Sequence, residues 1–229
     1  MKLGPALILI IAIVCIAASA GICETTASSA CPEARASFDV GYQSYKAACS
    51  KWCNERPGYS AWRYRGEELV EMGPAAVPFL IEKMEKREDA NLFPRQFSAV
   101  AKITRKRFPT SEYSSAARAG TMGDLFVRWW KVERKQTPAR FATLSQEWER
   151  CLKEGDRDRA QEASDQIRDM GVDALPLVIE KIKGGEQRFV PLVAQIMGEP
   201  VGGDVPTPDS VLQWWAANEK LVRLPDPSS

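Results

Sequence analysis

The sequence predicts an all-α protein built from two related helical modules. Segment 72–84 recurs as segment 170–182, and 7 of the 13 aligned residues are identical. Internal repeats of this kind are typical of stacked helical modules. In both copies apolar residues recur at intervals of three and four, which is the period of an amphipathic helix. No alternation of apolar and polar residues lasts long enough to indicate a β-strand.

Each copy opens with a turn that joins two helices. Gly73 and Gly171 stand where the end of a helix needs a left-handed residue, a backbone that glycine adopts at little steric cost. Pro78 and Pro176 fall near the end of the first turn of the next helix, where we expect proline to bend the helix. These four residues are therefore assigned structural roles.

The repetition continues beyond this helix pair. Segment 100–103 matches 193–196, and segment 124–130, which ends in a Trp pair, matches 209–215. The matching segments follow one another in the same order in both modules, but fewer residues separate them in the second module. We therefore expect shorter loops there. The expected helices are 58–72, 74–87, 92–107 and 123–136, then 157–171, 173–183, 187–198 and 208–220, with others near 38–54 and 143–154.

The repeated pattern, MG-x-x-A-V/L-P-x-L/V-I-E-K at 72–83 and 170–181, resembles that of bacterial HEAT-repeat proteins. It is similar in particular to the HEAT-like group named after phycobilisome lyases. The resemblance covers residues 58–220. It implies an α-solenoid-like stack of helix pairs, which mostly serves as a binding scaffold. The helices that carry the Trp pairs are not part of the usual HEAT pattern.

The start of the chain predicts export. Residues 1–23 contain one charge, Lys2, and an apolar run that ends in the small-x-small sequence Ala18-Ser19-Ala20. This pattern indicates a signal peptide over 1–20 and a periplasmic or extracellular location. The alternative is an uncleaved N-terminal membrane anchor, since about 20 residues can span a bilayer. The expected segments that follow are a flexible leader over 21–36, the modules over 37–141 and 142–222, and a tail over 223–229.

The chain has no histidine and six cysteines. The lack of histidine excludes the usual Ser-His-Asp and Cys-His catalysis and histidine-based zinc sites. We expect no metal and no cofactor, because a four-cysteine site would lack paired Cys-x-x-Cys spacing. An exported chain meets an oxidising compartment, so we predict a disulfide from Cys31 to Cys49 or Cys53. For Cys151 we expect a free, buried thiol.

Charge is unevenly distributed along the chain. Residues 102–140 hold ten Lys or Arg against three acids, whereas residues 141–229 hold ten against sixteen. The basic stretch predicts a surface for an anionic partner, either another protein or an anionic envelope polymer. Nucleic acid is not expected for an exported chain. The alternative is a solvated face that the acidic half neutralises. The candidate binding residues are Lys102, Arg105, Lys106, Arg107, Arg128, Lys131, Arg134 and Lys135.

The two Trp pairs, Trp129-Trp130 and Trp214-Trp215, suggest a carbohydrate platform as an alternative. Neighbouring helix residues point about 100° apart, so both rings of a pair cannot form one flat face. We expect one ring of each pair to seal its module and the other to pack over the edge. A glycan-cleaving enzyme would need two carboxylates at the sugar bond, and nothing in the sequence brings two together. The leading prediction is a non-catalytic, exported protein-interaction scaffold.

Overall fold

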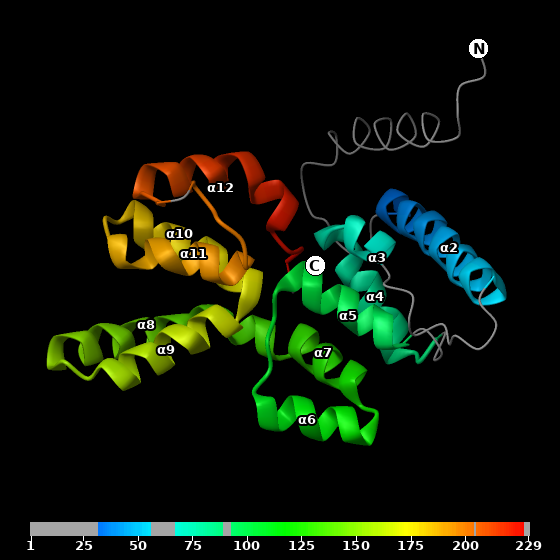
Figure 1. The fold of residues 1–229 in the computed structure, drawn as a ribbon, viewed down its shortest axis with the longest axis horizontal. Helices are drawn as coiled ribbons and strands as arrows, with labels where there is room; N and C mark the ends of the chain where they lie inside the picture. The colour runs from blue at the N-terminus through cyan, green and yellow to red at the C-terminus, as the bar shows by residue number, and fades with distance from the viewer. Residues whose placement is uncertain (1–31, 56–66, 89–92, 204, 227–229) are drawn as a thin grey trace, which may run out of the picture.

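The computed structural model describes residues 32–55, 67–88, 93–203 and 205–226. Every regular element in these segments is a helix, which confirms the all-α class (Figure 1). Among these helices, none combines the length and the apolar character that crossing a bilayer requires. The predicted signal peptide, most of the predicted leader and the side chain of Cys53 lie outside the described residues.

The first module contains the helices coloured blue to green in Figure 1. Helix α2 lies on the outside of the molecule, and α4 packs against both α5 and α7. Helix α6 packs on the outer side of α7 and was not expected from the sequence. The bounds are α2 (Pro32–Glu55), α3 (Glu67–Glu71), η3 (Pro74–Ala76), α4 (Val77–Glu85), α5 (Phe93–Thr104), α6 (Thr110–Ala119) and α7 (Met122–Lys131).

The second module begins with a long hairpin of α8 and α9, which run side by side away from the rest of the molecule (Figure 1). Helix α8 begins earlier than expected and includes residues 141 and 142, where the module boundary was predicted. The predicted helix over 123–136 stops at Lys131 and gives way to a 3₁₀ turn. The 3₁₀ turn η5 (Glu133–Gln136) follows α7 and ends the first module. The bounds in the second module are α8 (Thr137–Glu154), α9 (Arg157–Asp169), η6 (Gly171–Ala174), α10 (Leu175–Lys183), η7 (Gln187–Phe189), α11 (Val190–Met197) and α12 (Pro208–Val222).

The repeated prolines mark where α-helices begin. A 3₁₀ turn precedes each, and α4 starts at Val77 while α10 starts at Leu175, so Pro78 and Pro176 are the second residues of their helices. A proline in the first turn has no intrahelical hydrogen bond to lose. The predicted position near the end of the first turn is therefore wrong, because each α-helix begins only one residue before its proline.

One hydrophobic core runs through both modules. The stripe of α4 and the stripe of α10 are both buried in it. Trp129 and Trp215 are also buried, whereas their neighbours Trp130 and Trp214 are partly buried and pack against the core. Each Trp pair therefore contributes to packing and presents no flat aromatic platform.

Helix α2 contacts α4 through an aromatic stack and an ion pair. Phe38 stacks on Phe79 with ring centroids 5.0 Å apart. Arg35 forms a two-pronged ion pair with Glu82, which also accepts a hydrogen bond from Lys86. These pairings lower the pKa of the Glu82 carboxyl to about 2. A carboxylate held in this way stays ionised at neutral pH and does not act as a general acid.

Candidate functional site: the junction of the two modules

The loop that follows α5 docks directly on the second module. The backbone N–H of Arg107 donates to the carbonyl of Asp169 at 3.1 Å. Gly171 lies so close to this loop that a Cβ atom there would be 2.3 Å from the carbonyl oxygen of Thr104. Gly171 also has a φ of 73°, so both the backbone conformation and the close approach require glycine.

Lys106 anchors this loop from inside the molecule. Its side chain is buried, and Nζ donates to the carbonyl of Asp169 at 3.2 Å and lies 5.0 Å from the ring centre of Phe108. Burial lowers the pKa of the Lys106 ammonium, and the nearby positive charge of Arg140 lowers it further. Lys106 is therefore a structural anchor.

Arg134 ties three segments together at the same junction. Its Nε donates to both carboxylate oxygens of Asp173 at 3.0 Å, and Nη2 donates to the carbonyl of Pro225 at 2.9 Å. The guanidinium also lies 4.0 Å from the ring centre of Trp130. Burial raises the pKa of the Asp173 carboxyl, and the charge of Arg134 opposes that shift. The pair connects η5 to η6 and to the end of the chain.

These positions correct part of the predicted basic surface. Lys106 and Arg134 were expected to meet a partner, but only 8% and 5% of each residue is exposed. The expectation fails for these two because a one-dimensional count of charge does not tell which cations face inward. One feature of the sequence could have indicated that Arg134 pairs with an acid: the second copy of the repeat has Asp173 at the position where the first copy has Ala75.

Two further candidates are exposed but already neutralised by acids. Arg128 donates from Nη2 to Glu112 at 2.7 Å and from Nε to Glu133 at 2.8 Å. Lys131 forms an ion pair with Glu85. Because their charges are balanced at close range, these residues add little to a long-range positive field.

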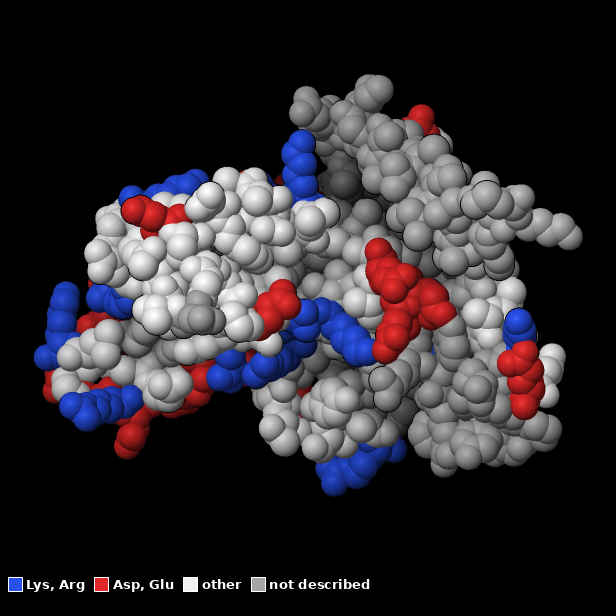
Figure 2. Space-filling view, turned by 45° about the horizontal axis from the view of Figure 1, so that its top comes forward, with Lys and Arg blue, Asp and Glu red and all other residues white. Residues whose placement is uncertain are grey.

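The remaining candidates are Lys102, Arg105, Arg107 and Lys135, and all four are exposed. Within the described segments none of them has a carboxylate partner, and the same holds for exposed Arg140. We define the junction surface as Lys102, Arg105, Arg107 and Arg140; Arg105 and Arg107 flank the buried Lys106 in sequence, and Arg140 lies near enough to lower the pKa of its ammonium. Figure 2 shows Lys and Arg side chains running across the middle of one face. The structure thus keeps a smaller basic surface than the sequence predicted.

Two cysteine side chains, Cys49 and Cys151, lie in the described part of the chain, and both are buried. Cys151 is a free, buried cysteine, and burial raises the pKa of its thiol, which donates to Glu147. Cys49 is buried too, while Cys31 lies outside the described residues, so the predicted disulfide stays a prediction. No group of three Cys, Asp or Glu side chains in the described segments could hold a metal ion.

Comparison with known proteins identifies no relative of this chain. No protein-family model, no curated protein and no solved structure matches it. The resemblance to HEAT-repeat proteins therefore stays a prediction carried by residues 72–83 and 170–181.

Proposed function

We propose that this chain is an exported, non-catalytic interaction scaffold whose junction surface binds an anionic protein. The signal-peptide pattern at residues 1–20 supports export, and the repeated helix pairs support a scaffold. The binding role rests on one observation: Arg105 and Arg107 are exposed on either side of a buried Lys106.

Anchoring of the loop favours binding because it reduces the entropy lost when a partner docks. Arg107 is held through its own backbone N–H and Lys106 through its ammonium group, and both bind the carbonyl of Asp169. Arg105 has a φ of 54°, which places it in the left-handed region. Two guanidinium groups are thus displayed from a fixed backbone, and each can bind a carboxylate through two hydrogen bonds.

The test is an affinity capture from envelope extract with the full chain as bait, at low and high salt. The test variant changes the junction surface to glutamine: Lys102→Gln, Arg105→Gln, Arg107→Gln and Arg140→Gln. A matched control removes the same charge elsewhere: Lys153→Gln, Arg157→Gln, Lys183→Gln and Arg223→Gln, all at exposed positions.

We expect one acidic protein to be retained by the parent and by the control, and lost by the junction variant. High salt should release it, because the Debye length falls from about 10 Å at 0.1 M to about 3 Å at 1 M. Purified partner and bait should then reproduce this order of affinities. Equal retention by both variants would show that the junction surface is only a solvated face.

A further inference from the structure

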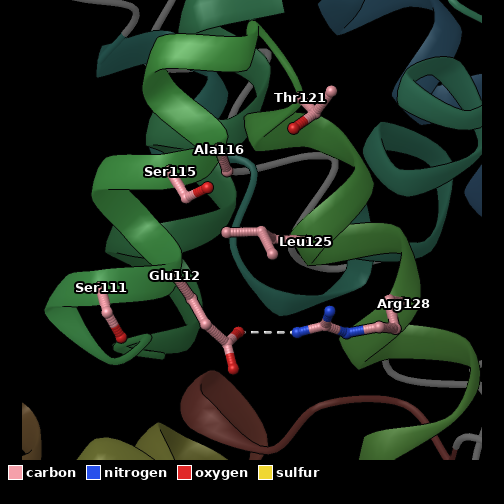
Figure 3. Close-up of a pocket in the computed structure, with 7 residues that line it drawn as sticks. All are labelled: Ser111, Glu112, Ser115, Ala116, Thr121, Leu125 and Arg128. Atoms are coloured by element: carbon pink, nitrogen blue, oxygen red, sulfur yellow. Dashed lines mark hydrogen bonds and ion pairs between the residues drawn. The ribbon is translucent and has the colours of Figure 1, made fainter.

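Helix α6 is an addition to the repeated pattern. In the second module, the described residues between α11 and α12 form no helix. Among the described side chains of α6, Ala116 alone is buried. The helix therefore contributes little to the hydrophobic core. It does form one wall of a shallow recess of about 390 Å³, whose other wall is α7 (Figure 3).

The recess is lined by three hydroxyl side chains, one ion pair and two apolar side chains. Figure 3 shows Glu112 of α6 reaching toward α7 and Arg128 of α7 reaching back to meet it. In the described segments the hydroxyls of the recess have no hydrogen-bond partner, and Leu125 lies between the two walls. The lining residues are Ser111, Glu112, Ser115, Ala116, Thr121, Leu125 and Arg128.

The charges of the recess select against an anionic ligand. Arg128 is already bound by two carboxylates, Glu112 and Glu133, so the site has no surplus positive charge. A cationic ligand would have to compete with the guanidinium of Arg128 for those same carboxylates. Within the described segments, Oε1 of Glu112 and Nη1 of Arg128 keep free hydrogen-bonding capacity, because the bonds to Glu112 and Glu133 use Oε2, Nη2 and Nε. An acceptor and a donor thus stand together beside the hydroxyls.

We propose that this recess binds a neutral saccharide, at a site separate from the junction surface. Sugar hydroxyls both donate and accept, so they can use the carboxylate, the guanidinium and the side-chain hydroxyls at once. Leu125 and Ala116 supply an apolar floor for the C–H face of a sugar ring. The volume lies at the lower end of the range of about 300–1,000 Å³ that small-molecule sites span.

The test titrates the full chain with trisaccharides and follows backbone amide shifts by NMR. Maltotriose and chitotriose are the neutral probes, while trigalacturonate and the glucosamine trimer carry negative and positive charge. The test variant is Arg128→Met. The control is Arg150→Met, because Arg150 is also exposed and also held by two carboxylates, Glu147 and Glu154. Thermal unfolding confirms that each variant folds.

We expect at least one neutral trisaccharide to give saturable shifts confined to α6 and α7. Arg128→Met should weaken that binding by about tenfold or more, since hydrogen bonds to charged groups are lost, while Arg150→Met should leave it unchanged. The proposal is overturned if no neutral probe gives saturable shifts there, if only a charged probe binds there, or if Arg128→Met binds as tightly as the parent. None of these outcomes depends on binding at the junction surface.

Discussion

The two copies of the repeat share a core but differ where they meet their surroundings. Gly73 and Gly171 are both left-handed, with φ of 68° and 73°. Helices α4 and α10 each have nine residues, begin with a proline in the first turn and bury the same apolar stripe. The residues that recur in the sequence are thus mainly those that build the turn and the buried face.

The differences lie at the module junction. A Cβ placed on Gly171 would collide with the loop that follows α5, whereas a Cβ placed on Gly73 meets nothing within 4 Å in the described segments apart from its own chain neighbours. Asp173 forms an ion pair with Arg134, whereas Ala75, at the matching position of the first copy, is exposed. The residues that the two copies share therefore build each module, and contacts that only the second copy makes, at Gly171 and Asp173, join the two.

The largest effect is expected for Asp173→Ala, which leaves the buried Arg134 without the carboxylate that it is paired with. Breaking one partner of a buried ion pair costs about 3–5 kcal/mol. Urea unfolding of the full chain measures the loss in the free energy of unfolding. The matched substitution in the first copy, Ala75→Asp, adds a charge at an exposed position and should change stability by less than about 0.5 kcal/mol. If Asp173→Ala and Ala75→Asp lowered the free energy of unfolding by similar amounts, the two copies would not differ at this position in the way described above.

Gly171→Ala should cost more than Gly73→Ala. Both substitutions force an alanine to a positive φ, and the ψ of −166° at Gly73 lies in a region that essentially only glycine adopts, so each costs on the order of 1–3 kcal/mol. At Gly171 the new Cβ also meets the backbone of Thr104 and Lys106, and overpacking adds about 1–3 kcal/mol. The same urea measurement compares the two variants. If they lose equal stability, the close approach at the junction is not a structural constraint.

A smaller, pH-dependent effect is expected at Glu82, whose match in the second copy is the exposed Glu180. Pairing with Arg35 and Lys86 lowers the folded-state pKa of Glu82 from 4.5 to about 2. Its stabilisation is therefore present above pH 4.5 and is lost as the pH falls through 2. Glu82→Gln should destabilise the protein by about 1 kcal/mol or less at pH 7, and the effect should disappear as the pH falls below 2.

Glu180→Gln is the control for that measurement, because Glu180 pairs only with the exposed Lys183 in the described part of the chain. We expect it to change the free energy of unfolding by a few tenths of a kcal/mol at most, at either pH. A pH-independent loss for Glu82→Gln would mean that Glu82 acts through packing and not through its charge.

The sequence predicted the helical class and the repeated helix pairs because both depend on local patterns. The apolar stripes of α4 and α10 appear in the sequence as intervals of three and four residues. Helix α6 escaped prediction because its sequence, TSEYSSAARA, carries too few apolar residues to show a period. A helix that buries few apolar side chains shows no clear hydrophobic period in its sequence.

The candidate site was only partly predictable because the direction of each charged side chain depends on contacts distant in sequence. Arg105 takes the left-handed conformation, with φ of 54°, that Gly198 takes at the matching place in the second module, with φ of 71°. An arginine gives no local sign of that conformation. The burial of Lys106 likewise depends on Asp169, which lies 63 residues away.

A double-mutant cycle on Arg134 and Asp173 tests most directly the claim that contacts made only by the second copy join the modules. Urea unfolding is measured for the full chain, Arg134→Met, Asp173→Ala and the double variant, with the exposed pair Arg128 and Glu112 as a reference cycle. We predict a coupling energy of about 2 kcal/mol or more for the junction pair and less than about 1 kcal/mol for the exposed pair. A junction coupling no larger than that of the exposed pair would contradict the account.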